Sequence, residues 1–156
     1  MLDLARLDLD EIAMALSDQT DYEHRWLIDP GTGEIVLWTS DTGIDGENPV
    51  DLDELDLLPI GPVSSATWYG DMVDFAEGVS NDTTGRRLAR ALRGKGAFRR
   101  FKDELYDEYP DLVSAWQTFR DVRARRRAVE WLLDEELIQD EAAHTYLAEH
   151  PDPPLP

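Results

Sequence analysis

The chain has 156 residues, 42% of them hydrophobic, with no cysteine and a net charge of −19. This length suits one domain with a hydrophobic core, and the lack of cysteine excludes disulfides, thiolate zinc sites and cysteine nucleophiles. No apolar run approaches the ~18 residues that cross a bilayer, and the alternating Leu and Asp at the start are unlike a signal peptide. We therefore expect a soluble cytoplasmic protein, with no membrane partner, that forms a single domain over residues 1–150.

The charge is unevenly distributed along the chain. Residues 1–85 carry 20 acidic and 2 basic side chains, residues 86–127 carry 6 and 13, and residues 128–156 carry 8 and none. The overall acidity argues against nucleic acid, because its field repels phosphate. The concentrated basic stretch, however, either pairs with acidic side chains of the same fold or binds an anionic partner.

The N-terminal part is predicted to form a helix followed by a small sheet. Asp8 is a predicted N-cap, with Glu11 three residues later, for a helix over about 9–17. Aromatic and β-branched runs at 25–28 and 34–39, separated by Asp, Pro and Gly residues, predict a hairpin. A loop follows, and residues 57–60 are predicted to form a short edge strand.

After Thr67 the apolar residues recur at helical spacing, and the chain is predicted to be helical. The expected helices cover 67–79, 84–93 with Thr84 as cap, 97–106, 111–135 and a short segment after Asp140. In the third of these, Phe98, Phe101 and Leu105 are expected to face inward. The overall prediction is an α+β fold: a small N-terminal β-hairpin unit with one helix, then a helical half of four to five helices. The proline-rich residues 151–156 are predicted to be a flexible tail.

The sequence offers little support for an enzyme. Residues 41–43, Asp-Thr-Gly, match the triplet of aspartic proteases, but that chemistry needs two carboxylates sharing a proton and the chain has one copy. The same acidic loop does not fit the ligand register of an EF-hand. The histidines, His24, His144 and His150, lack the spacing of a metal site. We predict no catalytic residue, no metal and no cofactor, and we leave enzymatic activity open as the less favoured interpretation.

The basic stretch at 86–102 is the candidate binding segment. It holds eight basic residues and no acid: Arg86, Arg87, Arg90, Arg93, Lys95, Arg99, Arg100 and Lys102. A Gly-Lys-Gly turn precedes a predicted helix start, where free N–H groups and the helix dipole favour an anion. Arginines in the first helical turn oppose that dipole, so local helix stability does not explain them. The predicted ligand-binding residues are Arg93, Gly94, Lys95, Gly96, Arg99 and Arg100, with phosphate or nucleic acid as the anionic partner.

Two other interpretations of the basic stretch stay open. It pairs with acidic surface of the same molecule, or with a second copy or another protein, which makes the chain a homodimer or interaction module. A helix-turn-helix interpretation is disfavoured, because a turn at Gly94 or Gly96 places charged residues at positions that must be buried.

A family resemblance coincides with the basic stretch. Residues 94–103 read Gly-Lys-Gly-Ala-Phe-Arg-Arg-Phe-Lys-Asp, and weaker matches lie at 8–12, 29–34, Trp116 and residues 131–132. Together they resemble the bacterial uncharacterised protein family 0158, over residues 8 to about 135. The resemblance implies a bacterial origin and a small α+β protein, and it implies no activity.

Overall fold

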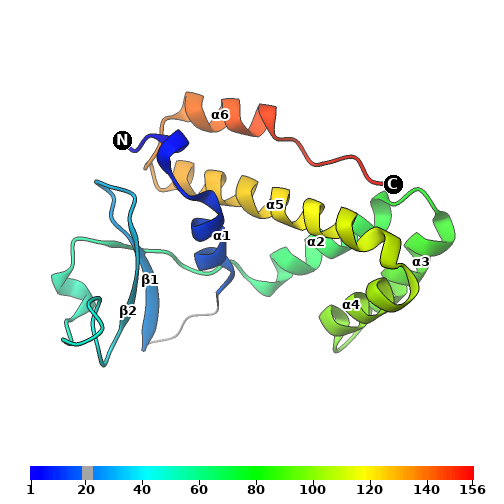
Figure 1. Ribbon diagram of the computed structural model, residues 1–156, viewed down its shortest axis with the longest axis horizontal. Coiled ribbons are helices and arrows are strands. Elements are labelled where there is room, and N and C mark those ends of the chain that lie inside the picture. Colours follow the sequence, from blue (N-terminus) through cyan, green and yellow to red (C-terminus); the bar gives the residue numbers. More distant parts are fainter. Residues whose placement is uncertain (19–22) are drawn as a thin grey trace. The chain divides into compact units, whose positions relative to one another are not determined.

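A computed structural model describes residues 1–18 and 23–156, which form an α+β fold (Figure 1). Its helices and strands are α1 Leu9–Ser17, β1 His24–Ile28, β2 Ile35–Thr39, β3 Leu58–Pro59, α2 Ser65–Gly78, α3 Asp82–Ala91, α4 Ala97–Glu108, α5 Val113–Asp134 and α6 Asp140–Glu149. Short 3-10 turns lie at Leu4–Arg6, Leu52–Glu54 and Pro110–Leu112. The predicted fold class is confirmed, with the strands near the N-terminus and most helices after them. No helix of the described ranges is long and apolar enough to cross a membrane.

The chain divides into two compact units, each with its own hydrophobic core. The first unit comprises Met1–Val63 and Ala124–His150, and the second comprises Ser64–Arg123 and Pro151–Pro156. The first unit has 23 acidic and 5 basic residues, whereas the second has 11 and 10. Nearly all of the net charge, −18 of −19, therefore belongs to the first unit. The single domain over 1–150 stays a prediction.

The first unit is built on the predicted helix and hairpin. The Asp8 side chain caps α1 by accepting a hydrogen bond from the Glu11 N–H at 3.1 Å. Strands β1 and β2 pair antiparallel, with Trp26 opposite Leu37, and the edge strand β3 pairs with the other side of β1. The indole N–H of Trp26 donates to Asp18 at 2.7 Å. The core is made by residues of α1, β1, α5 and the segments that follow β3 and precede α6: Ile12, Leu16, Ile28, Ile60, Val129, Leu132 and Ile138.

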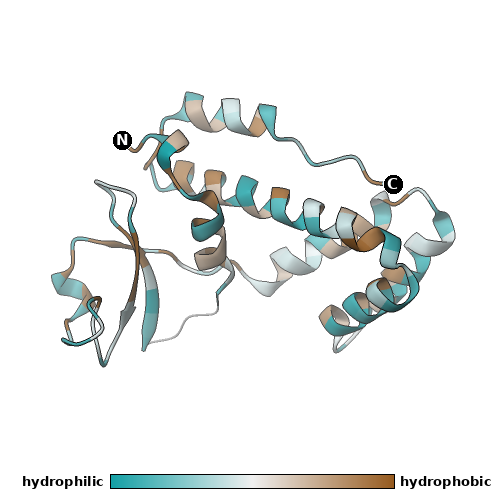
Figure 2. Cartoon of the chain, in the orientation of Figure 1, coloured by the Kyte–Doolittle hydropathy of each residue, from teal (hydrophilic) through white to brown (hydrophobic). Residues whose placement is uncertain are grey.

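The second unit is organised around an aromatic core. Phe75 of α2 and Phe101 of α4 both pack edge-on against Trp116 of α5, with ring centroids 5.3 and 5.1 Å apart. Leu88 of α3 and Leu105 of α4 are fully buried beside them. Aromatic pairs of this kind add stability beyond that of the area they bury. They hold α4 in place by the face that carries Phe101 and Leu105. The hydropathy colouring of Figure 2 shows that most of the residues of α3 and α4 are hydrophilic.

Two details of the helical prediction are wrong. The N-cap before α3 is Asn81, whose side chain accepts from the Thr84 N–H at 3.1 Å, so the helix begins one turn earlier than expected. Phe98 is 46% exposed. Because α4 buries Ala97, Phe101 and Leu105, which recur every four residues, Phe98 falls beside that stripe and faces solvent.

The last six residues contact the second unit. The Ser80 N–H donates to the Pro156 carbonyl at 2.7 Å, and Arg123 donates to Asp152 at 2.9 Å. Leu155 packs against the aromatic core, close to Gly78. Flexibility of this tail stays a prediction, and these contacts provide a direct way to examine it.

Candidate functional site

Of the six predicted ligand-binding residues, Arg93, Gly94, Lys95 and Gly96 lie in the turn between α3 and α4, and Arg99 and Arg100 lie in the first turn of α4. Gly94 and Gly96 both have positive φ, 76° and 75°, a conformation that glycine adopts at little cost. Gly96 is the N-cap of α4 and has no side chain to satisfy the first N–H groups of the helix. The structure therefore places a tight turn directly before a helix start, at the position that the sequence predicts.

Arg100 holds this turn together. Its Nε donates to the Ala91 carbonyl at 3.1 Å, and its two terminal nitrogens donate to the carbonyls of Arg93 and Lys95. The Tyr69 hydroxyl donates to the neighbouring Leu92 carbonyl at 2.8 Å. Carbonyls at the end of α3 thereby gain donors, and the Arg100 charge lies at the negative end of the α3 dipole.

The other bases of the turn are turned to solvent. The Arg99 side chain is 89% exposed and lies 3.7 Å from Asp103, an exposed pair that contributes little to stability. Arg93 and Lys95 are exposed, and no carboxylate of the described residues lies within 4 Å of either. Their positive charges are thus available at a turn whose backbone Arg100 fixes.

Another part of the basic stretch faces acids of its own unit. A groove of about 710 Å³ lies between α3 and α4, with Arg87 and Arg90 on the α3 side and four carboxylates, together with Arg100, on the α4 side. It is lined by Arg87, Arg90, Arg100, Asp103, Glu104, Asp107 and Glu108, together with Ala91. Arg87 and Arg90 thus share a groove with carboxylates of the same unit, and pairing of the basic stretch within the molecule stays an open alternative.

Sequence reasoning missed an aromatic feature of α4. Phe98 and Tyr106 are 46% and 40% exposed, and they lie eight residues apart. The Lys102 amine lies 5.8 Å from the centre of the Tyr106 ring, and Gln117 donates to the Tyr106 hydroxyl at 3.3 Å. The spacing of Phe98, Lys102 and Tyr106, four residues apart each time, is the signal that could have found them.

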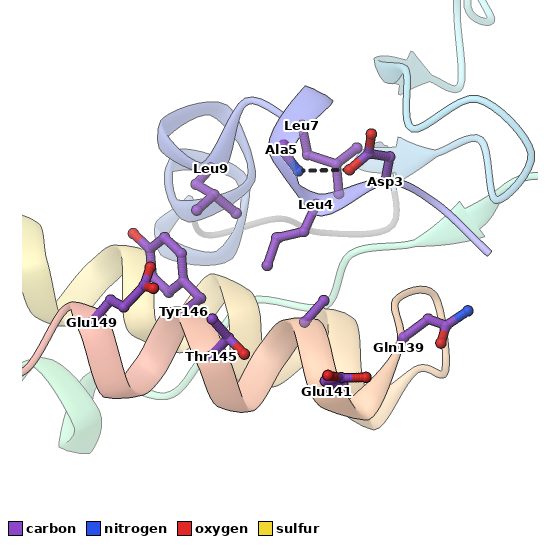
Figure 3. Close-up of a pocket in the computed structure, with 11 residues that line it drawn as sticks. Asp3, Leu4, Ala5, Leu7, Leu9, Gln139, Glu141, Thr145, Tyr146 and Glu149 are labelled. Carbon is purple, nitrogen blue, oxygen red and sulfur yellow. Dashed lines mark hydrogen bonds between the residues drawn. The ribbon is translucent and has the colours of Figure 1, made fainter.

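A second groove, of about 650 Å³, lies in the first unit (Figure 3). Leu4 and Leu9 point into it from the N-terminal segment, facing Thr145 and Tyr146 of α6. Burial raises the pKa of Tyr146, Arg125 opposes the shift and Asp10 adds to it. The charged residues that line this groove are all acidic: Asp3, Glu141 and Glu149. Its chemistry suits an apolar, positively charged segment rather than an anion.

The described residues contain no group of three or more His, Asp or Glu side chains that could hold a metal ion.

Comparison with known proteins places the chain in a family. The model of the Uncharacterised protein family (UPF0158) matches residues 1–148. The chain belongs to this family. A UPF0158 protein of Pseudomonas aeruginosa is 33% identical over 138 residues, which cover 84% of each chain. No solved structure matches. The family match extends into α6 as far as residue 148, beyond the residues that carried the resemblance, and the description of the family names no activity.

Proposed function

We propose that the protein is a non-enzymatic cytoplasmic binding module that holds an anionic partner, phosphate or nucleic acid, at the α3–α4 turn. The observation that carries the proposal is the Arg100 clamp. By engaging the carbonyls of Ala91, Arg93 and Lys95, it fixes a turn from which exposed bases project. A pre-organised cluster of charge loses less entropy on binding than a mobile one.

The clamp suggests a division of roles within the predicted site. Arg93, Lys95 and Arg99 are exposed and supply the charges that contact the anion. Gly94 and Gly96 allow the backbone to turn sharply before the N–H groups of α4. Arg100 is a positioning residue, because its donors are directed to backbone carbonyls.

The overall acidity of the chain argues less strongly against an anionic partner than the composition alone indicates. The second unit, which holds the turn, carries 11 acidic and 10 basic residues. At physiological salt, charges are screened beyond about 8 Å, so local charge matters more than the net charge of the chain. A near-neutral unit with bases gathered at one turn is compatible with an anionic partner.

The test compares two double variants that change the net charge equally. Lys95→Glu with Arg99→Glu reverses the site, whereas Arg6→Glu with Arg120→Glu reverses exposed arginines elsewhere. Binding of inorganic polyphosphate and of a fluorescein-labelled oligonucleotide is measured by anisotropy and competition. We expect the first variant to lose at least about tenfold in affinity with an unchanged melting temperature, and the control to lose little. Equal losses in both variants, or no binding by the unmodified protein, would reject the proposal.

A protein-interaction module, including a homodimer, is the second candidate. The groove of Figure 3 favours it, because an apolar floor with acidic walls complements a basic segment of a protein partner. The measurement is the molar mass in solution at low and high salt. A dimer that dissociates as salt rises supports this function, and a monomer at all concentrations rejects the homodimer form of it.

A further inference from the structure

The outer face of α4 combines exposed rings with basic side chains. An α-helix advances by 100° per residue, so Phe98, Lys102 and Tyr106 are each offset by about 40°, and Arg99 falls within the same arc of about 100°. The carboxylates of Asp103 and Asp107 lie beyond this arc and line the groove toward α3. The face formed by Phe98, Arg99, Lys102 and Tyr106 is here called the basic-aromatic face. Its arc holds no acidic residue, and Asp103 at its border lies 3.7 Å from Arg99.

We infer that the anionic partner is a single-stranded nucleic acid whose bases stack on Phe98 and Tyr106. The inference rests on the proposed function, since the same partner's phosphates would contact Arg93, Lys95 and Arg99. Sequence-tolerant binding of single strands combines positive charge along the backbone with aromatic rings under the bases. The basic-aromatic face has both, and it continues from the turn along α4.

Phe98 is exposed, unlike the other phenylalanines of the second unit. The other phenylalanines of this unit, Phe75, Phe101 and Phe119, are 0, 1 and 3% exposed. Phe98 is 46% exposed and lies outside the aromatic core that holds the other three. An exposed ring beside two basic side chains lies where a nucleobase could cover it.

Tyr106 is held in a fixed orientation at the other end of the face. Gln117 of α5 donates to its hydroxyl at 3.3 Å, and the Lys102 amine lies over its ring at 5.8 Å from the centre. The rise of the helix separates Phe98 and Tyr106 by roughly 12 Å along its axis. Two rings at this spacing, with Lys102 between them, suit successive contacts with an extended strand more than one compact ligand.

The geometry favours a single strand over a duplex. Bases in a duplex are stacked on one another and unavailable to a protein ring, whereas those of a single strand are open to stacking. A duplex would meet only the basic side chains. The basic-aromatic face therefore predicts a preference for single strands that surface charge alone does not provide.

The experiment measures anisotropy of fluorescein-labelled oligouridylate and oligothymidylate of 20 nucleotides, with a duplex of equal length and inorganic polyphosphate as comparisons. The full chain is used in two forms, unmodified and with Phe98→Leu and Tyr106→Leu. The leucines keep apolar bulk while removing the rings. Circular dichroism and the melting temperature check that each variant is folded.

We expect the unmodified chain to bind single strands at least about tenfold more tightly than duplex, from one stacked base or more. The leucine variant should lose that preference while its affinity for polyphosphate is unchanged. Equal affinity for single strand and duplex, or full single-strand binding by the leucine variant, overturns the inference and leaves the proposed function standing. Failure to bind polyphosphate and oligonucleotides alike overturns both.

A protein partner for the same face is distinguished by these variants. Leucine stays apolar but lacks the flat ring, so a partner that needs only apolar contact tolerates the substitution better than a stacked base does. Unchanged binding of the single-stranded oligonucleotides by the leucine variant therefore counts against stacking. Loss of single-strand binding in Phe98→Leu with Tyr106→Leu, with polyphosphate binding retained, supports it.

Discussion

Arg123 forms an ion pair with Asp71, with Nη1 3.3 Å from Oδ1, and the Asp71 side chain is only 3% exposed. The same guanidinium lies 2.7 Å from Asp74 and 2.9 Å from Asp152, and 4.7 Å from the centre of the Phe119 ring. Burial by itself lowers the pKa of Arg123, but hydrogen bonds and the charges of Asp152 and Asp74 outweigh it and raise the pKa. Arg123 thus links α5, α2 and the tail within the second unit.

Replacing Arg123 with Met should destabilise the second unit strongly. The change keeps the side chain's bulk but leaves the buried Asp71 carboxylate without this cation, and breaking a buried pair costs about 3 kcal/mol or more. The melting temperature should fall by roughly 6–12 °C, measured by circular dichroism. Arg120→Met is the matched control, because Arg120 is 47% exposed and, among the residues that the structure describes, pairs with the adjacent Asp121 alone. A control that melts as low as Arg123→Met contradicts the assignment.

Arg100 and Arg99 should respond differently to the same substitution. Arg100→Met removes the donors to three backbone carbonyls, and we expect a loss of about 1–2 kcal/mol in unfolding free energy. Arg99→Met removes only an exposed pair and should change it by less than about 0.5 kcal/mol. Urea denaturation measures both. If Arg100→Met is neutral, the clamp does not hold the turn.

The tail residues should be ordered despite their proline content. Sequence alone predicts a flexible tail, whereas the contacts of Leu155 and Pro156 with the second unit predict a fixed one. We expect a ¹⁵N relaxation order parameter near 0.85 for the Leu155 amide, similar to that of α2. An order parameter below about 0.6 would instead support the flexible tail. Leu155→Ala should also lower the melting temperature if the side chain packs as the structure shows.

The carboxyl group of Asp45 should titrate at unusually low pH. Its ionised form accepts hydrogen bonds from the backbone and side chain of Asn48 and from the Glu47 N–H, which lowers its pKa from 3.8 to about 2. The folded pKa lies below the unfolded one, so this stabilisation of the loop is complete above about pH 4. It is lost as the pH falls through about 2.

Carboxyl-carbon NMR titration measures this pKa directly. Asn48→Ala removes the side-chain donor but keeps the backbone N–H, so the pKa of Asp45 should rise only part of the way toward 3.8. A midpoint near 3.8 in the unmodified chain would show that the loop does not hold the carboxylate.

Moderate salt should raise the melting temperature. The first unit carries 23 acidic and 5 basic residues, and this excess repels itself in the compact state. Screening by about 0.15 M salt weakens that repulsion. Differential scanning calorimetry over a salt series checks the prediction. A melting temperature that falls steadily with salt would show that attraction between acidic and basic segments dominates.

The regular elements of this protein follow from local sequence. The Asp8 cap, the turn between the hairpin strands and the apolar repeats after Thr67 predict elements that the structure contains within a few residues. These signals are local because capping, turn conformation and amphipathic periodicity each depend on residues close together in the chain. The position of the glycine turn at 94–96 and the segregation of charge were equally accessible.

The tertiary structure decides whether an individual side chain is buried or exposed and what it contacts. Phe98 was expected inside, but α4 packs through Ala97, Phe101 and Leu105, and only the position of its partner helices determines which stripe is buried. The sequence presents Arg100 as one more base in an acid-free run. The fold instead brings it within reach of carbonyls at the end of α3, because a turn at two glycines folds α4 back toward α3. Composition sets how many charged side chains the protein has. The fold decides which groups each of them contacts, because those groups come from segments that are distant in the sequence.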